Sequence, residues 1–336
     1  MSGVRIRRAE LTDREAVIDG IGDVYWGLDY LPDLYTQFVT HPDFLSFVAV
    51  DGQEVIGFYS AHIHDGGLAV CKRAARVKKQ HDGTGVLKLL TTHLEREVRQ
   101  LTTVRRESMT CGSENAARIS ESYKQRKGLR EVMRMQFLFW EVAVGTLPSV
   151  ERSQSPNVAE MTSADLEALF AHEQSRKRIF PQDILSSFFV PFRCRPENMA
   201  HFINDRASCV ASYRADDTTP GSDVTPHVKT VTSAGDVEKI TLLSASFVYR
   251  ARKGHSYNVT FFGTEYADLE AHLFYHVHKL QRFGHETVIL SLVFLQEFAP
   301  LVLERTKTFL GQFGITRSQY PAIDHSIFFE SDFGGQ

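Results

Sequence analysis

The feature that most constrains this chain is a glycine-containing loop between a strand pattern and an amphipathic helix pattern. Residues 68–77 read as a strand, and the next segment carries Gln80, Gly83 and Gly85 in the arrangement Gln-x-x-Gly-x-Gly. Apolar residues then recur at helical spacing, namely Val86, Leu87, Leu89, Leu90, Leu94 and Val98. At a helix N-terminus, unpaired backbone N–H groups and the helix dipole attract anions. The loop therefore predicts a binding site for a phosphate or pyrophosphate group.

The residue types in the loop agree with an anion site. A side chain at Gly83 or Gly85 would hold a phosphate away from the backbone or require a strained positive φ. Lys78 and Lys79 add positive charge beside the loop. An ordinary strand-to-helix turn is the alternative, because a short glycine motif has many chance matches. A Rossmann or P-loop site is excluded, because neither Gly-x-Gly-x-x-Gly nor Gly-Lys-Ser/Thr follows the strand.

Patterns on both sides of the loop predict an α/β (α+β) fold, with a mixed, mostly antiparallel sheet flanked by helices. Two β-rich runs separated by Gly52-Gln53 predict an antiparallel hairpin before the loop. The predicted strands of the first half cover residues 4–7, 46–51, 54–64, 68–77, 105–111 and 132–142. Helices are predicted after Thr12, over 86–98 and over 115–126.

A segment rich in serine and proline divides the chain. Its 336 residues, 43% of them hydrophobic, provide enough apolar material for two cores of roughly 150 residues each. We place a first domain at residues 1–147, a linker at 148–157 and a second domain at 158–336. The second half loosely repeats the rhythm of strands and helices without the glycine loop. We therefore expect a degenerate copy that has lost the loop's binding site.

Charge and hydropathy exclude several classes of partner. A formal net charge of −3 gives no general attraction to nucleic acid, and no apolar run reaches the roughly 18 residues of a membrane helix. The first residues lack the apolar stretch of a secretory signal, so we expect a cytoplasmic protein without a nucleic-acid or membrane partner.

No metal site is predicted. His272 and His276 have helical spacing, but no carboxylate stands at the HExxH position, so we expect them on a partly buried helix. The cysteines show no metal-ligand spacing and are expected to be reduced and mostly buried: Cys71, Cys111, Cys194 and Cys209. The aromatic runs at 187–192 and 328–329 are expected in the core.

The glycine loop in its context resembles the GNAT superfamily of N-acetyltransferases. The likeness covers residues 4–142 and includes the hairpin, the Leu-Leu-x-x-x-Leu pattern after the loop, and Asn115, Tyr123 and Gly128-Leu129 before the last strand. It implies a GNAT fold, a GNAT-like second domain without a cofactor site, and acetyl-CoA as cosubstrate. The cofactor residues implied are Ala75, Val77, Lys78, Gln80, His81, Asp82, Gly83, Thr84, Gly85, Val86 and Asn115.

A shorter motif, Tyr25-Trp26-Gly27-Leu28-Asp29-Tyr30-Leu31-Pro32, is similar to the vertebrate histidine N-acetyltransferases, as are Arg76-Val77 and the two-domain length. This likeness implies a free amino acid as the small-molecule amine, with L-histidine preferred and N-acetyl-L-histidine as product. The acceptor residues would be Tyr25, Asp29, Tyr30 and His62, with an exposed Asp29 holding the substrate ammonium group. Alternatively, both tyrosines pack into the core and Asp29 caps a helix.

GNAT enzymes generally let the amine attack the thioester directly, so the resemblance implies no acyl-enzyme. Tyr123 is the implied acid for the departing thiolate, although it lies one residue too early in the motif and Lys124 occupies the expected place. The strand before the loop lacks the usual carboxylate base. Glu107 on the next strand is the predicted replacement, with His62, His64 or a chain of water molecules as alternatives.

Other functions stay open on the sequence alone. A non-catalytic acyl-CoA sensor or scaffold would keep the loop but lack turnover, in line with the shifted Tyr123 and the missing strand carboxylate. An acetyltransferase for another amino acid, or for a peptide or protein amine, would share the loop as well. The sequence predicts neither the acyl-chain length nor the oligomeric state.

Overall fold

The structure is a computed structural model that describes residues 3–22, 25–117, 119, 121–148, 158–214, 234–318 and 324–333. The first half contains β1 (Val4–Arg8), α1 (Leu31–Thr40), β2 (Phe44–Asp51), β3 (Glu54–His64), β4 (Ala69–Val77), α2 (Val86–Arg99), β5 (Arg106–Gly112), α3 (Ser113–Ala117), α4 (Glu121–Lys127) and β6 (Arg130–Ala143). The second half contains β7 (Val158–Glu160), α5 (Ser163–Ala171), α6 (Glu173–Ile179), β8 (Ile184–Ser187), β9 (Val190–Arg193), β10 (Ala207–Tyr213), α7 (Ala234–Val237), β11 (Ile240–Ala251), β12 (Gly254–Phe262), α8 (Leu269–Leu280), β13 (Thr287–Leu295), α9 (Ala299–Gly311), β14 (Thr316–Ser318) and β15 (His325–Asp332).

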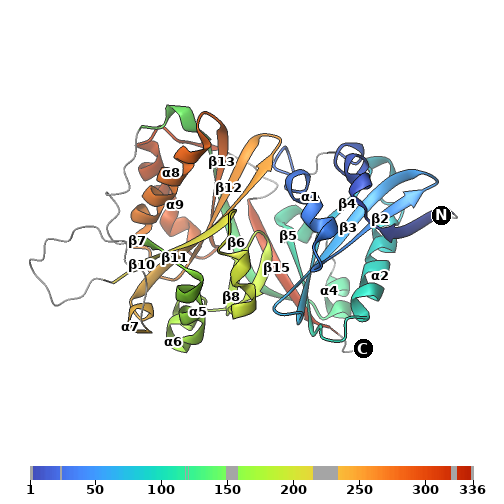
Figure 1. Ribbon diagram of the computed structural model, residues 1–336, viewed down its shortest axis with the longest axis horizontal. Coiled ribbons are helices and arrows are strands. Elements are labelled where there is room, and N and C mark those ends of the chain that lie inside the picture. Colours follow the sequence, from blue (N-terminus) through green and yellow to red (C-terminus); the bar gives the residue numbers. More distant parts are fainter. Residues whose placement is uncertain are drawn as a thin grey trace, which may run out of the picture.

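One continuous sheet contains two copies of the same strand arrangement. In one copy, β1, β2, β3 and β4 are antiparallel neighbours, β4 pairs in parallel with β5, and β5 pairs with β15. In the other, β7, β10, β11 and β12 are antiparallel neighbours, β12 pairs in parallel with β13, and β13 pairs with β6. Strands β15 and β6 pair at the centre, so each half of the sheet is completed by a strand from the other half of the chain (Figure 1).

This arrangement confirms the predicted mixed, mostly antiparallel sheet and its second, related half. The strand predictions of the first half all correspond to observed strands within a few residues. The helix predicted after Thr12 is replaced by a 3-10 turn at Leu11–Asp13 and a π turn at Ala16–Gly20, and the helix over 115–126 is split into α3 and α4. The division into domains stays a prediction, and residues 149–157 of the linker lie outside the described residues.

Helix α2 packs on the sheet through one face. It buries residues spaced by four against β2, β3 and β4, namely Val86, Leu90, Leu94 and Val98. Gly57 on β3 permits this close approach, because a Cβ added there would lie 3.0 Å from Leu90 Cδ1 and 3.1 Å from Val86 Cγ1. Leu87 and Leu89 of the same helix are exposed, although they share its apolar sequence pattern.

The buried histidines of α8 make hydrogen bonds within the second half. His272 Nδ1 and His276 Nε2 lie 2.7 and 2.9 Å from Ser244 Oγ, and His276 Nδ1 lies 2.9 Å from Tyr257 Oη. The described residues contain no group of three or more His, Cys, Asp or Glu that could hold a metal ion. All four cysteines are buried and free, and no described helix is long and apolar enough to cross a membrane.

Candidate active site

The parallel strands β4 and β5 diverge and leave an opening in the sheet. Their pairing covers only residues 69–72 of β4 and 106–109 of β5, whereas β12 and β13 of the second half pair over residues 255–260 and 288–293. A cavity of about 650 Å³ occupies the opening between β4 and β5. The second half also contributes to its wall through Phe189, Tyr249, Ser256, Asn258 and Ser326.

A β-bulge lies on β4 where the opening begins. Ser60 of β3 pairs with Arg73 and Phe58 pairs with Arg76, so three steps along β4 match two steps along β3. Ala74 within the bulge has a φ of +55°, a left-handed conformation that costs an L-residue roughly 1–2 kcal/mol. A bulge takes its extra residue out of the ladder and redirects the backbone there, and Ala74 lines the cavity. Backbone strain of this kind clusters at functional sites.

The glycine loop leads into α2, whose first two turns reach the cavity. Gly83 and Gly85 have φ values of +71° and +90°, which explains why glycine stands at both positions. Gly85 is the N-cap of α2 and provides no side-chain cap, so the N–H groups of the first turn are available to a ligand. Leu87 and Thr91 line the cavity, and Leu87 is 45% exposed although it is apolar. The first two turns of α2 therefore border the cavity, although the glycine loop itself does not line it.

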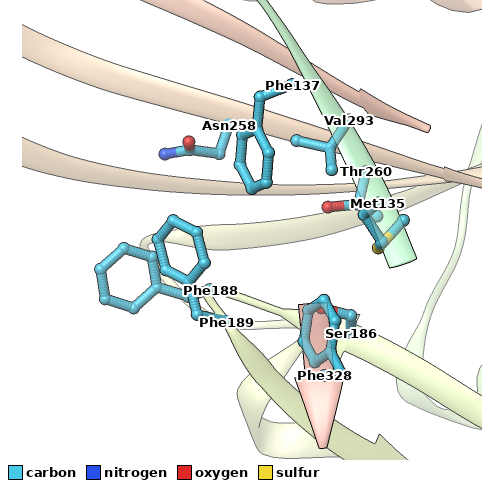
Figure 2. Close-up of a pocket in the computed structure, with 9 residues that line it drawn as sticks. All are labelled: Met135, Phe137, Ser186, Phe188, Phe189, Asn258, Thr260, Val293 and Phe328. Carbon is cyan, nitrogen blue, oxygen red and sulfur yellow. The ribbon is translucent and has the colours of Figure 1, made fainter. Parts of the chain in front are cut away.

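A hairpin from the second half closes one side of the opening. Strands β8 and β9 turn at Phe188 and Phe189, whose φ values of +49° and +63° are those of a turn that favours Asn or Gly. The first half holds this tip: Arg73 Nη2 donates to Phe188 O and Thr110 Oγ1 donates to Phe189 O, each at 2.8 Å. Both rings and Phe137 line a second cavity of about 20 Å³ (Figure 2), and Phe189 stacks on Phe137 with ring centroids 5.4 Å apart.

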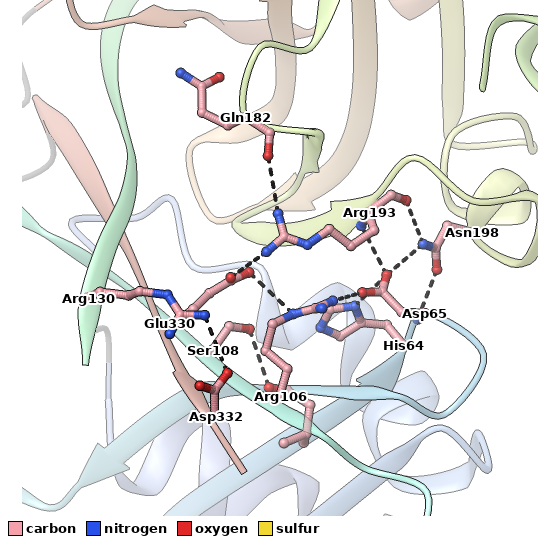
Figure 3. A network of polar contacts seen from close by, with 11 residues as sticks. His64, Asp65, Arg106, Ser108, Arg130, Gln182, Arg193, Asn198, Glu330 and Asp332 are labelled. Atoms are coloured by element: carbon pink, nitrogen blue, oxygen red, sulfur yellow. Dashed lines mark hydrogen bonds and ion pairs between the residues drawn. The ribbon is translucent and has the colours of Figure 1, made fainter. Parts of the chain in front are cut away.

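A buried ionic network fixes this hairpin and the exchanged strand β15 (Figure 3). The carboxylate of Glu330 on β15 is fully buried and pairs with Arg193 of β9 and Arg106 of β5. Arg106 also pairs with Asp65, whose Oδ1 accepts hydrogen bonds from Arg193 N at 3.0 Å and Asn198 Nδ2 at 2.7 Å. The network therefore joins β5, β9 and β15 to the turn after β3.

No family model and no curated protein matches the chain. Solved structures match it over nearly its whole length. A GCN5-related N-acetyltransferase from Sphaerobacter thermophilus has a TM-score of 0.51 and 11% identity, with 99% of this chain and 96% of the other covered. The tandem GNAT protein from the clavulanic acid biosynthesis pathway has a TM-score of 0.51 and 10% identity, with 99% of both chains covered. Saccharomyces cerevisiae N-myristoyltransferase has a TM-score of 0.55 and 10% identity, with 98% of this chain and 83% of the other covered.

The chain has the tandem GNAT fold. This finding confirms the fold that the glycine loop and its context predicted. The two parallel strand pairs of this fold differ in length. Strands β4 and β5 pair over residues 69–72 and 106–109 and then separate at the cavity, whereas β12 and β13 stay paired over residues 255–260 and 288–293.

Most of the predicted cofactor residues surround the N-terminus of α2. Gly83 N donates to Asp82 Oδ1 at 3.0 Å and Thr84 Oγ1 donates to His81 O at 2.7 Å, so these residues shape the glycine loop. None of the residues from Val77 to Val86 lines the cavity: Lys78 Nζ pairs with Glu54 at 2.6 Å, and Val86, the first residue of α2, is buried. Ala75 and Asn115 line the cavity.

Tyr123 on α4 also lines the cavity. Lys124, which occupies the expected place in the GNAT motif, is directed elsewhere: its Nζ pairs with Glu121 at 2.8 Å and lies 5.6 Å from the centre of the Phe329 ring. Helix α4 ends next to Gly128, which has a φ of +62°. The shift by one residue therefore leaves the tyrosine at the cavity and directs the lysine away from it.

Glu107 is buried on β5 but does not line the cavity. Its Oε1 lies 2.7 Å from Lys72 Nζ, and Lys72 also pairs with Glu95 at 2.8 Å. Burial alone would lower the pKa of Lys72, but the neighbouring Tyr59, Glu107 and Glu95 outweigh it and raise that pKa. The lysine thus stays charged and engages the carboxylate predicted as the base.

His62 is buried on β3 and is also absent from the cavity wall. Its ring stacks on Phe44 with centroids 4.4 Å apart, and burial holds its pKa well below the usual value, so the ring is neutral. His64 lies on the same strand with Nδ1 3.1 Å from Asp65 Oδ1. Neither histidine lines the cavity. Of the bases that the sequence allowed, a chain of water molecules therefore remains.

The segment before α1 supplies an aromatic wall. Tyr25, Trp26 and Tyr30 line the cavity, and Trp26 is 50% exposed. The expectation of an exposed Asp29 is wrong: the side chain is buried, and its oxygens accept from Arg76 Nη1 at 2.6 Å and Nη2 at 3.1 Å. Oδ1 also accepts from the backbone N of residue 31 at 3.0 Å, as the capping alternative requires.

Sequence reasoning missed the contribution of the second half to this wall. Tyr249, Ser256 and Asn258 come from the hairpin of β11 and β12, more than 170 residues after β4, and no local motif marks them. The Phe-Phe pair at 188–189 was expected as core, whereas Phe189 faces the cavity. Arg73 lines the cavity too. The sequence pattern indicated only that this strand lacks a carboxylate, and it predicted no role for Arg73.

Proposed function

We propose that this protein is an acetyl-CoA-dependent N-acetyltransferase that acetylates the α-amino group of a free amino acid, with L-histidine the preferred acceptor and N-acetyl-L-histidine the product. One observation carries the proposal. A single cavity between the diverging strands brings together the first two turns of α2, the bulge at Ala74, Tyr123 and an aromatic wall.

Acetyl-CoA fits this site on three grounds. The N–H groups of the first turn of α2 are suited to a diphosphate, and a Cβ at Gly83 would meet nothing within 4 Å, so the loop has open space beside it. Residues 73–77 of β4 extend past the last residue paired with β5, which leaves a strand edge for the amide groups of a pantetheine arm. The related fold of yeast N-myristoyltransferase was solved with bound myristoyl-CoA, which supports an acyl-CoA ligand for this fold.

Bound there, the cofactor would supply an acetyl thioester for direct attack by the amine. The residues of this chain then have three tasks. The redirected backbone around Ala74 and Ala75 is placed to donate a hydrogen bond to the developing oxyanion. The Tyr123 hydroxyl is placed to give a proton to the departing thiolate. The aromatic wall of Tyr25 and Tyr30 excludes water and holds the acceptor, so that catalysis is mostly positioning.

The contribution of the second half favours a small acceptor. Phe189, Tyr249 and Asn258 add bulk to the cavity wall on the side we assign to the acceptor, where a peptide or protein substrate would need an open groove. The aromatic side chains and the polar Ser256 and Asn258 suit an imidazole ring, which stacks on aromatic rings and exchanges hydrogen bonds. These features support histidine over an unbranched aliphatic side chain.

Free-thiol release from acetyl-CoA in the presence of each of the twenty amino acids tests this function. We expect turnover with histidine above the others, and the loss of thiol release when histidine is omitted. Tight binding of acetyl-CoA without thiol release from any amino acid would instead support the sensor or scaffold. Release that needs a peptide N-terminus or a lysine side chain would support a protein acceptor.

A further inference from the structure

We propose that Arg73 binds the α-carboxylate of the acceptor and makes that carboxylate a requirement for efficient acetylation. The inference rests on the proposed function, because it concerns the acceptor side of the same cavity. It narrows the substrate class from primary amines to free α-amino acids.

The charge balance of the cavity wall is the first observation. Lys72 and Arg73 are the only charged residues among those that line the described cavity. The Lys72 ammonium group is matched by Glu95 and Glu107, at 2.8 and 2.7 Å. No ion pair to Arg73 occurs among the described residues, although Arg73 is only 9% exposed.

A buried guanidinium without a carboxylate is unusual in this chain. The neighbouring Arg76 is also buried and has a bidentate partner in Asp29, and Arg106 and Arg193 share Glu330. Burying an ionised group without a counter-charge is costly, so such groups normally have an acidic partner or bind a ligand. Arg73 has a place for that ligand, because it lines the cavity.

The surroundings of Arg73 position its guanidinium group. The carbon at its centre lies 4.9 Å from the ring centre of Phe188 and 5.4 Å from those of Tyr30 and Phe38. Its Nη2 donates to Phe188 O at 2.8 Å, which uses one of five N–H donors. A guanidinium fixed in this way is pre-organised for the two parallel hydrogen bonds of a carboxylate.

The position of Arg73 on β4 suits an acceptor whose amine must lie next to the bulge. Successive side chains of a strand point to opposite faces, and Lys72 contacts Glu95 of α2 while Arg73 contacts Tyr30 and Phe38 near α1. The helix N-terminus suited to the cofactor and the arginine therefore lie on opposite sides of the sheet. Arg73 directly precedes the bulge at Ala74, and in an α-amino acid a single carbon separates the amine from the carboxylate. A carboxylate held by Arg73 thus keeps the amine close to the bulge.

This arrangement predicts strong discrimination against acceptors without an α-carboxylate. We expect kcat/KM for histidine to exceed that for histidinamide and for histamine by roughly 10²–10³-fold, because both analogues leave the buried guanidinium without a counter-charge. A peptide N-terminus has an amide at the same position and should be an equally poor acceptor.

The test combines these three acceptors with three variants. Arg73→Gln should lower kcat/KM for histidine by about 10²-fold, change that for histidinamide little, and leave the KM for acetyl-CoA unchanged. The matched control Arg5→Gln removes an exposed arginine of β1 and should change none of these values. Arg73→Lys should recover part of the discrimination, since a lysine restores the charge without the bidentate geometry.

Several outcomes would overturn the proposal. They are equal kcat/KM of the wild-type protein for histidine and histidinamide, or equal losses for both acceptors in Arg73→Gln. If that variant does not fold, the discrimination by the wild-type protein and calorimetric binding of histidine against histidinamide in the presence of CoA decide the question. Absence of thiol release from every acceptor would refute the proposed function, while preferential binding of histidine over its amide would still support the carboxylate site.

Discussion

The substitution Glu330→Gln tests the strand exchange that completes the first half of the fold. Glu330 is fully buried on β15 and pairs with Arg193 and Arg106, which come from opposite halves of the chain (Figure 3). A glutamine keeps the shape but removes the charge, which leaves two largely buried guanidinium groups with one fewer counter-charge. Removing one partner of a buried ion pair typically costs 3–5 kcal/mol, so we expect the free energy of unfolding to fall by about 3 kcal/mol.

The chain offers a matched control two residues further along the same strand. Asp332 pairs with Arg130 at 3.4 Å, but its side chain is 79% exposed, and exposed ion pairs contribute less than about 1 kcal/mol. Measured by urea denaturation, the free energy of unfolding should therefore fall by about 3 kcal/mol in Glu330→Gln and by less than about 1 kcal/mol in Asp332→Asn. Equal losses in the two variants would refute the reasoning that the buried network locks β15 into place.

Three further predictions follow from particular contacts. Tyr123→Phe should lower kcat by 10²-fold or more with an unchanged affinity for acetyl-CoA, as measured by thiol release and calorimetry, and an unchanged kcat would exclude Tyr123 as the acid. Gly57→Ala should lower the free energy of unfolding by about 1–3 kcal/mol, because its Cβ would lie 3.0 Å from Leu90 and 3.1 Å from Val86, and an unaltered urea midpoint would contradict this packing. Burial would raise the pKa of Asp65, but pairing with His64 and hydrogen bonds from Arg193 N and Asn198 outweigh it and lower the pKa from 3.8 to about 2. The corresponding stabilisation of about 2 kcal/mol is present above pH 4 and is lost as the pH falls from about 4 to 2, so Asp65→Asn should flatten the pH dependence of unfolding in that window.

The sequence predicted local features of the fold well, because they depend on short-range patterns. The alternation in residues 46–64, the glycine loop and the spacing of Val86, Leu90 and Leu94 each report a physical constraint within one or two elements. The exchange of β6 and β15 between the halves depends on pairing across about 150 residues for β6 with β13 and about 220 for β15 with β5, for which no local pattern exists.

The candidate site likewise contains residues that a local motif predicts and residues whose surroundings depend on distant elements. Gly83, Gly85 and Tyr123 belong to a local motif, and the structure brings the N-terminus of α2 and Tyr123 to one cavity. The surroundings of the predicted bases could not be foreseen, because the partners of Glu107 and His62 come from other elements: Lys72 engages the carboxylate, and Phe44 covers the imidazole ring.

The acceptor wall was the least predictable part of the site. Its members from the second half, such as Tyr249 and Asn258, reach the cavity only because the two halves share one sheet. The pairing of Asp29 with Arg76 likewise joins two segments 47 residues apart, and it turned an expected ligand for the substrate into a buried structural carboxylate.

Calorimetric titration of acetyl-CoA into the wild-type protein and the double variant Gly83→Val, Gly85→Val tests the central claim most directly. A Cβ at Gly83 meets no atom within 4 Å, so its effect on the free protein comes from the positive φ, roughly 1–2 kcal/mol per residue. The account predicts saturable binding to the wild type and an affinity at least about tenfold lower in the double variant, a loss of about 1.4 kcal/mol. No binding to the folded wild-type protein, or the same affinity in a folded double variant, would contradict it.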